Sequence, residues 1–229
     1  MKKAKADPSK EEGFIFLTVI TMENKTQKVI VYVDGFNFYY GLKSKGWKKY
    51  YWLDIVSFFE CLLKPYQELV EVNYFSACPT DTRKSERQSK FFSANKTNSK
   101  FKLHLGKYLK KEIKCKYCNQ IIHTFEEKET DVRIATQILF DAVNKRCDIS
   151  IVCSADSDLI PPIEKIKEFD HYHKVFVYFP PDRFSSNLHA LANATKRLDG
   201  AKAIFEQCVF PDKVITQNSY EIERPHKWQ

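Results

Sequence analysis

The stretch Lys28-Val-Ile-Val-Tyr-Val-Asp34-Gly35 indicates the fold class of this chain. Its apolar run is short and rich in β-branched residues, which is typical of a strand buried on both faces of a sheet. A second run of this kind, Ile149-Ser-Ile-Val-Cys153, leads into Ser154-Ala-Asp156-Ser-Asp158. Both runs therefore predict parallel strands whose carboxyl ends are followed by acidic residues.

The rest of the chain alternates between helix-like and strand-like segments. Helical patterns predict helices at 52–63, 82–95, 131–143, 159–169 and 185–197, and strand-like runs lie at 70–77 and 175–179. This alternation predicts an α/β fold with a mostly parallel central sheet and helices on both faces. Residues 101–125 contain two alternating segments around Cys115-Lys-Tyr-Cys118, which predict a small basic β-hairpin, or knuckle, inserted into the domain.

The composition excludes several classes of protein. Of 229 residues, 43% are hydrophobic and only six are glycine, which excludes a disordered tail, a collagen-like repeat and a coiled coil. No apolar run approaches the roughly 18 residues that a membrane span needs, so no membrane partner is expected. The seven cysteines are an odd number in a chain of this size, which favours free thiols in the cytoplasm.

The net charge of +8 is concentrated in residues 81–118, which contain twelve Lys or Arg residues and three acidic ones. One basic segment in an otherwise nearly neutral chain favours a nucleic-acid partner, because Lys and Arg neutralise phosphates and release counterions. Lys84, Arg87 and Lys90 recur at helical spacing and are candidate substrate-binding residues. The alternative is that the segment is a solvated surface helix and hairpin.

Acidic residues follow both buried strands, with Asp34 after the first and Asp156 and Asp158 after the second. Asp131 opens a predicted helix and can point to the same edge, because the carboxyl ends of parallel strands face one crevice. Each Asp by itself is more often a helix cap. Four converging carboxylates would repel one another, and a hard cation such as Mg²⁺ or Mn²⁺ relieves that repulsion. The pattern therefore predicts a metal site.

The hairpin contains the pattern of a second metal site. Cys115, Cys118 and His123 have the spacing of half a zinc site, and His104 could complete a set of two cysteines and two histidines. This set predicts a structural Zn²⁺. The alternative is that the two cysteines are reduced thiols at the surface.

Four short motifs follow one another along the chain: Val31-Tyr-Val-Asp34-Gly35-Phe-Asn37-Phe-Tyr-Tyr-Gly41, Glu126-Glu-Lys128-Glu-Thr130-Asp131-Val132, Ser154-Ala-Asp156-Ser157-Asp158-Leu159 and Val177-Tyr-Phe-Pro180-Pro181-Asp-Arg183-Phe-Ser185. Together they resemble the NYN-domain family, and within it the LabA-like members of the PIN-like metal-dependent nucleases. The resemblance spans about residues 28–214, in the order and at the spacing of the family. One departure is Ala155, which stands where the family usually has Gly.

The resemblance implies a Rossmann-like PIN fold. It also implies an endoribonuclease that hydrolyses single-stranded or structured RNA in an acidic pocket with Mg²⁺ or Mn²⁺. Asp34, Asp131 and Asp156 would be the main metal ligands, and Asp158 would be a further ligand or bind a metal-coordinated water. This set is chemically apt, because a metal ion lowers the pKa of water and neutralises charge that develops on a phosphate.

The resemblance also implies roles for neighbouring polar residues. Asn37 would orient Asp34 or a water, and Ser154 would stabilise the loop. Lys128 and Thr130, beside Asp131, could meet the scissile phosphate, and the alternative is that Lys128 is a solvated surface residue. A catalytically inactive RNA-binding protein of the same fold is the alternative. A haloacid-dehalogenase-like phosphatase is disfavoured, because Asp34-Gly-Phe-Asn-Phe lacks the nucleophile motif of that class.

The aromatic run Phe36, Phe38, Tyr39 and Tyr40 has two interpretations. Most of these rings are expected to pack in the core, because each buries a large area. One ring could instead stack on a base of a single strand.

The expected domain organisation has three parts. Residues 1–21 are interpreted as an N-terminal extension, with an added edge strand at Phe14–Ile20 as the alternative. Residues 22–214 form the predicted nuclease domain, and 215–229 form a C-terminal tail. A homodimer is compatible with the sequence.

Overall fold

The computed structural model describes residues 26–229 of the chain. Its centre is a six-stranded sheet in the order β3-β2-β1-β6-β7-β8, in which every neighbouring pair is parallel. The strands are β1 (Gln27–Asp34), β2 (Gln67–Ser76), β3 (Phe101–Leu105), β6 (Ile149–Cys153), β7 (Lys174–Phe179) and β8 (Ala194–Arg197). The predicted α/β fold with a mostly parallel sheet is confirmed.

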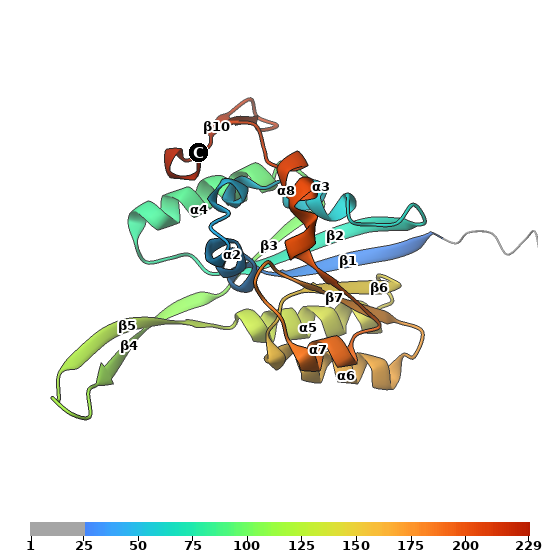
Figure 1. Cartoon of the computed structure of the whole chain (residues 1–229), viewed down its shortest axis with the longest axis horizontal. Coiled ribbons are helices and arrows are strands. Elements are labelled where there is room, and N and C mark those ends of the chain that lie inside the picture. Colours follow the sequence, from blue (N-terminus) through green and yellow to red (C-terminus); the bar gives the residue numbers. More distant parts are fainter. Residues whose placement is uncertain (1–25) are drawn as a thin grey trace, which may run out of the picture.

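Helices cover both faces of this sheet (Figure 1). One face carries α2 (Gly35–Ser44), α3 (Ile55–Glu60), α4 (Thr82–Asn95) and α8 (Lys202–Gln207). The other face carries α5 (Thr130–Val143), α6 (Ile160–Phe169) and α7 (Ser186–Leu191). The side chains of β1 alternate between the two resulting cores, which explains why this strand is apolar at every position from 29 to 33.

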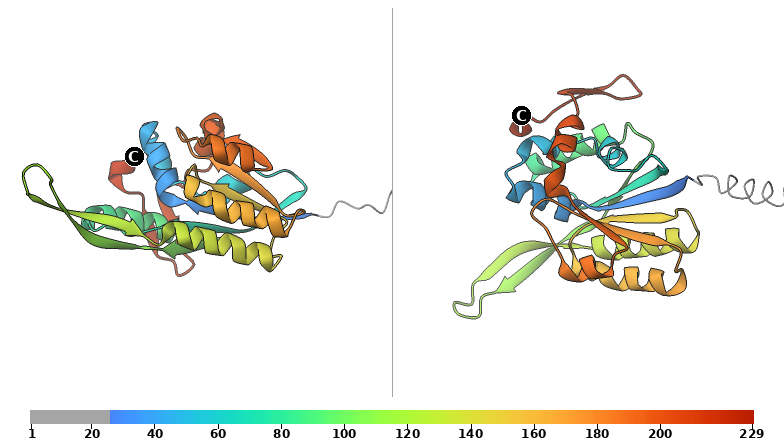
Figure 2. Two further views of the ribbon diagram at one scale, coloured as in Figure 1. Left: turned by 90° about the horizontal axis from the view of Figure 1, so that it is seen from below. Right: turned by 45° about the vertical axis from the view of Figure 1, so that its right-hand side comes forward.

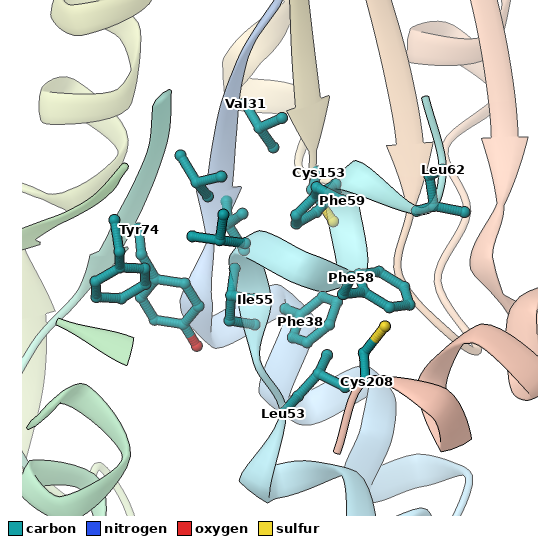
Figure 3. Close-up of a cluster of buried hydrophobic side chains, with 14 of the residues drawn as sticks. Val31, Phe38, Leu53, Ile55, Phe58, Phe59, Leu62, Tyr74, Cys153 and Cys208 are labelled. Carbon is teal, nitrogen blue, oxygen red and sulfur yellow. The ribbon is translucent and has the colours of Figure 1, made fainter. Parts of the chain in front are cut away.

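The core beneath α2 and α3 combines aliphatic side chains with aromatic rings, among them those of Phe38, Phe58 and Phe59 (Figure 3). Phe38 of α2 and Phe58 of α3 both pack on Phe205 of α8, with ring centroids 6.0 and 4.3 Å from it. Burying a Phe side chain stabilises the fold by about 1.5–3 kcal/mol. This packing fixes α2 directly behind the carboxyl end of β1, where Asp34 lies.

The strand order reverses between β1 and β6, because β2 and β3 lie on one side of β1 whereas β6, β7 and β8 lie on the other. The two strands are in register, with Val33 opposite Cys153. At such a reversal the loops after the two strands diverge and leave a crevice for a ligand. The residues after Val33 and after Cys153 therefore share one crevice.

A two-stranded antiparallel hairpin, β4 (Lys107–Lys114) and β5 (Ile121–Lys128), extends away from the body of the domain (Figures 1 and 2). The predicted insertion at 101–125 has different bounds in the structure. Phe101–Leu105 pair with β2 as the parallel edge strand β3, and Phe101 is buried in the core. Alternating residues look the same in an edge strand as in a hairpin, so the pattern alone could not separate the two.

Two expected helices are shorter than predicted. The helix expected at 185–197 ends at Leu191, and β8 follows it at 194–197 because Asn193 pairs with Val175 through two hydrogen bonds. The helix expected at 52–63 is the helix α3 alone, preceded by the 3-10 turn η1 (Lys48–Trp52). The Asp54 side chain accepts a hydrogen bond from Ser57 N and starts α3 there.

The segment expected as a C-terminal tail packs against the domain. It forms β9 (Lys213–Ile215), β10 (Glu221–Glu223) and the 3-10 turn η4 (His226–Trp228). Ile222 is buried in the core, and the Trp228 ring lies 5.9 Å from that of Tyr51. The interpretation of residues 1–21 lies outside the described residues. Within residues 26–229 no helix is long and apolar enough to cross a membrane.

Candidate active site

Asp34 is the last residue of β1 and also caps α2. Its Oδ1 accepts a hydrogen bond of 3.0 Å from Asn37 N, and its Oδ2 accepts one of 2.9 Å from Ser154 Oγ. The residue is only 5% exposed. Burial raises the pKa of its carboxyl above the ordinary value, and these two hydrogen bonds partly oppose that rise. The carboxylate is fixed at this place because Asp34 both ends β1 and caps the start of α2.

The loop after β6 holds Asp156 beside Asp34. The fully buried Ser154 donates to Asp34 and accepts a hydrogen bond of 3.0 Å from Asp156 N. Ala155 N donates to Asn37 Oδ1 at 3.3 Å. The Asn37 side chain thus holds the turn after β6, whereas its backbone N–H holds Asp34. The turn forms with Ala155 in place of the family's Gly.

Asp131 reaches the same place from the first turn of α5. Its carboxylate, that of Asp34 and that of Asp156 each offer an oxygen within 4.8 Å of the others. The pKa of Asp131 is raised to about 6, mainly by burial and then by the negative charges of Asp34 and Asp156. A carboxyl held so far above its ordinary pKa lies in a site that would be stabilised by a positive charge.

The donor set of this cluster fits a hard divalent cation. It consists of carboxylate oxygens alone, which are the ligands that Mg²⁺ and Mn²⁺ prefer. Among residues 26–229, this is the only group of three or more potential ligands that lie so close together. Asp158 lies outside the group. It is exposed, and its backbone N–H donates to Asp156 Oδ1 at 3.0 Å. Its charge still contributes to raising the pKa of Asp131.

The cluster forms the floor of a pocket of about 370 Å³. The remaining wall comes from α2, from the base of the β4–β5 hairpin and from the loop after β7, and includes Phe36, Tyr40, Tyr108, Phe125, Glu127 and Arg183. Arg183 provides the only positive charge among the residues that line it, and its Nε has no hydrogen-bond partner among the described residues. The sequence analysis missed Arg183 and Glu127, although both belong to the quoted motifs.

The other predicted substrate-binding residues are not all at this pocket. Thr130 lines it and is hydrogen-bonded to Glu127. Lys128 is exposed and pairs instead with Glu126 at 3.1 Å. Lys84 and Arg87 line a neighbouring cavity, whereas Lys90 lines neither.

The structure does not bring the four predicted zinc ligands together. His104 belongs to β3, where its Nε2 lies 2.6 Å from Asn73 Oδ1 and its ring stacks on Phe75. Cys115 and Cys118 lie at the far tip of the hairpin. At about 3.3 Å per residue, the eight residues of β4 separate them from His104 by roughly 25 Å. His123 is paired with Glu112 across the hairpin.

A parallel sheet in this order, with three carboxylates near the point where the order reverses, defines an α/β protein with an acidic crevice at the carboxyl ends of its strands. The NYN domain family matches residues 28–198, and the chain belongs to this family. This is the family that the four sequence motifs resemble.

The chain is also similar to a known enzyme and to a protein of known crystal structure. A 6-hydroxy-3-succinoylpyridine 3-monooxygenase of Pseudomonas putida strain DSM 28022 / S16 is 24% identical over 182 residues. The match covers 64% of this chain and 57% of that protein, so the chain spans little more than half of the relative. A protein of unknown function from Vibrio parahaemolyticus has a similar crystal structure, with a TM-score of 0.54 and 20% identity. That likeness covers 77% of this chain and 96% of the other, and it concerns the fold.

Proposed function

We propose that this protein is a metal-dependent endoribonuclease of the LabA-like kind, which hydrolyses RNA phosphodiester bonds in the acidic pocket with Mg²⁺ or Mn²⁺. The observation that carries the proposal is the convergence of Asp34, Asp131 and Asp156 within 4.8 Å at the carboxyl end of the sheet. Membership of the NYN family supports it.

The three carboxylates would hold the ion, which when bound would lower the pKa of the attacking water and neutralise charge that develops on the phosphate. The protein's own residues keep this site in shape. Ser154 links Asp34 to the loop of Asp156, and Asn37 ties that loop to α2. Such outer hydrogen bonds fix the direction in which a ligand oxygen points.

Arg183 is the best-placed group for the phosphate itself. It lines the acidic pocket, and its Nε has a free donor with respect to the described residues. A guanidinium can bind two phosphate oxygens at once and is always charged. Thr130 adds a hydroxyl to the same wall, next to Asp131. Lys128 is exposed at the base of the hairpin, where it can contact the part of the RNA that lies outside the pocket.

The test is cleavage of a labelled single-stranded RNA, a hairpin RNA and a DNA of the same sequence with Mg²⁺, with Mn²⁺ and with EDTA. Wild-type protein should cleave RNA only with the metal. Asp156→Asn should abolish cleavage and leave RNA binding intact or tighter, because it removes both a metal ligand and a negative charge. Asp158→Asn is the comparison, and it should retain part of the activity because Asp158 lies outside the cluster. Cleavage that persists in EDTA and in Asp156→Asn would refute the proposal.

An RNA-binding protein without catalysis is the second candidate on the same fold. It predicts RNA binding that needs neither metal nor Asp156. The binding measurements of the same experiment separate it from the nuclease, because a non-catalytic protein would leave every labelled RNA intact in all conditions.

A third candidate, chemistry on an aromatic small molecule, is favoured only by the match to the pyridine monooxygenase. Incubation with 6-hydroxy-3-succinoylpyridine, oxygen and a reductant, followed by chromatography, tests it. Consumption of 6-hydroxy-3-succinoylpyridine by a protein that does not cleave RNA would favour this candidate over the nuclease.

A further inference from the structure

A second and larger cavity, of about 560 Å³, adjoins the acidic pocket. Phe36, Tyr40 and Tyr108 line both of them. Cavities of this size commonly bind molecules as large as a nucleotide. Because the two spaces share a wall, a molecule in the larger cavity would lie next to a phosphate in the acidic pocket. We call it the aromatic cavity.

The aromatic cavity has ring faces available for stacking. Tyr39 and Tyr40, on adjacent positions of α2, remain 38% and 46% exposed although they lie in a hollow of the surface. Tyr51 packs behind Tyr39 with ring centroids 5.0 Å apart, and Trp228 packs against Tyr51 at 5.9 Å. These rings are held in place by one another, so a planar ligand could stack on them without ordering a loose side chain.

Positive charge surrounds the same cavity. None of the residues that line it is acidic, and five are basic: Lys43, Lys48, Lys84, Arg87 and Lys227. None of these five forms an ion pair with any acid in residues 26–229. The acidic pocket next to it has the opposite balance, with four acids and one Arg. Unpaired cations around an aromatic wall match a ligand that has both a ring and a negative charge.

One wall also has a free polar group. Gln88 of α4 donates a hydrogen bond of 3.0 Å from Nε2 to Ser76 Oγ, and both residues line the cavity. The Gln88 Oε1 is buried and has no partner among the described residues. An unsatisfied buried acceptor costs free energy, and the exocyclic amino group of a base would satisfy it.

We propose that the aromatic cavity binds the nucleotide next to the cleaved bond, with its base against Tyr39 and Tyr40 and its phosphate at Lys84 and Arg87. The inference rests on the proposed ribonuclease function and names the part of the substrate that occupies this space. A single strand fits better than a duplex, because a base must leave its stack to enter a cavity. A neutral aromatic compound would use the rings and leave the five cations without a partner.

The experiment measures binding of adenosine 5′-monophosphate to the full chain in EDTA, where the acidic pocket cannot use a metal. Of the three tryptophans, only Trp228 lines the cavity. Trp52 is fully buried in the core, and Trp47 is half-buried against Tyr50 and Phe205. Binding of the nucleotide should therefore change tryptophan fluorescence excited at a wavelength that the base does not absorb. In Trp228→Phe this change should be largely lost, while calorimetry should still detect binding.

Two variants test the contacts, and each has a control. Arg87→Ala and Tyr39→Leu should each weaken nucleotide binding by about ten-fold, the size expected for one charged contact or one stacked base. Arg83→Ala is the matched control for Arg87, because it removes the same charge from α4 at an exposed position that does not line the cavity. It should bind like the wild type. Circular dichroism confirms that each variant is folded.

The results separate this proposal from the proposed function. The proposal for the cavity is wrong if the wild-type protein cleaves RNA but does not bind adenosine 5′-monophosphate. It is also wrong if Arg87→Ala and Arg83→Ala bind the nucleotide equally well. Neither result would contradict the proposed nuclease activity. If the nucleotide binds, binding is weakened by Arg87→Ala and Tyr39→Leu, and no RNA is cleaved, then the cavity is a nucleotide site and the proposed nuclease activity is wrong. Where both hold, Arg87→Ala should raise the KM for a single-stranded RNA about ten-fold and leave kcat nearly unchanged.

Discussion

Ser154 Oγ lies 2.9 Å from Asp34 Oδ2 and donates a hydrogen bond to it, across 120 positions of the sequence. Ser154 Oγ also accepts a hydrogen bond from Asp156 N. One buried hydroxyl therefore links the carboxylate of Asp34 to the backbone of Asp156, although it is not itself in the group that could bind a metal.

Ser154→Ala should lower the affinity for Mn²⁺ by roughly ten-fold, because outer hydrogen bonds that orient metal ligands have effects of this size. It should also lower the free energy of unfolding by about 1–3 kcal/mol, since Asp156 N is left without its acceptor. Titration calorimetry with Mn²⁺ and thermal melting measure the two effects. Ser157→Ala, at an exposed position of the same loop, is the control and should change neither. Equal Mn²⁺ affinities for both variants would contradict the role of Ser154.

The raised pKa of Asp131 makes stability depend on pH in the metal-free protein. The folded pKa of about 6 exceeds the ordinary value of 3.8, so the folded state binds the proton more tightly. The resulting stability is fully present below about pH 4 and is lost as the pH rises through about 6. In EDTA at pH 7.5, Asp131→Asn should therefore be more stable than the wild type. We expect a gap of about 1 kcal/mol, after discounting for the partial exposure of this group.

Melting in EDTA from pH 4 to 8 measures this gap. A difference of about 1 kcal/mol corresponds to roughly 2–4 °C in Tm for a domain of this size, and it should close towards pH 4. Addition of Mg²⁺ should raise the Tm of the wild type more than that of Asp131→Asn. A gap that is the same at every pH would mean that the pKa of the Asp131 carboxyl is not raised in the folded protein.

Arg183→Gln should lower kcat/KM for RNA by roughly a hundred-fold, the effect of losing one charged donor to a phosphate in a pocket. Affinity for Mn²⁺ should not fall, because Arg183 is a cation and repels the metal. Arg197→Gln is the control, since this arginine is exposed and pairs with Asp199 outside both cavities. Steady-state cleavage and Mn²⁺ titration distinguish the outcomes. A parallel loss of metal binding would instead indicate that the loop after β7 had moved.

The two faces of the β4–β5 hairpin should differ in RNA binding. Side chains alternate along a strand, so Lys110 shares a face with Tyr108 and Phe125, which line the acidic pocket, whereas Lys111 points the other way and pairs with Glu126. Lys110→Ala should weaken binding of single-stranded RNA and lower the slope of log affinity against log salt by about 0.7. Lys111→Ala removes the same charge and should change the slope much less. Equal salt slopes for the two variants would mean that the RNA does not bind along this face of the hairpin.

The strands of the sheet and the three clustered acidic residues could be predicted because each is marked by a local pattern in the sequence. A strand buried on both faces is apolar at every position, and Asp34 and Asp156 follow such strands directly. Asp131 could be added because it opens a helix. The residues alone did not separate Asp158 from Asp156, because both belong to one loop. Only the family resemblance gave Asp158 the secondary role of a further ligand or of binding a metal-coordinated water.

Other features depended on pairing between distant segments, which a periodic pattern does not encode. Phe101–Leu105 alternate like a hairpin strand, yet they pair with β2. This assignment moved His104 away from Cys115 and Cys118. Arg183 and Glu127 reach the pocket only because the loop after β7 and the base of the hairpin both meet α2 there. A basic residue in the loop that follows the buried strand β7 was the available signal for Arg183.

The order in which the carboxylates occur along the chain has a consequence for its synthesis. Asp34 and Asp131 leave the ribosome before β6, the strand that must insert beside β1 to carry Asp156 into place. A nascent chain that ends after α5 therefore contains the basic residues of 81–118 but only two of the three clustered carboxylates. The cluster of three carboxylates can therefore form only after β6 has been synthesised and has paired with β1.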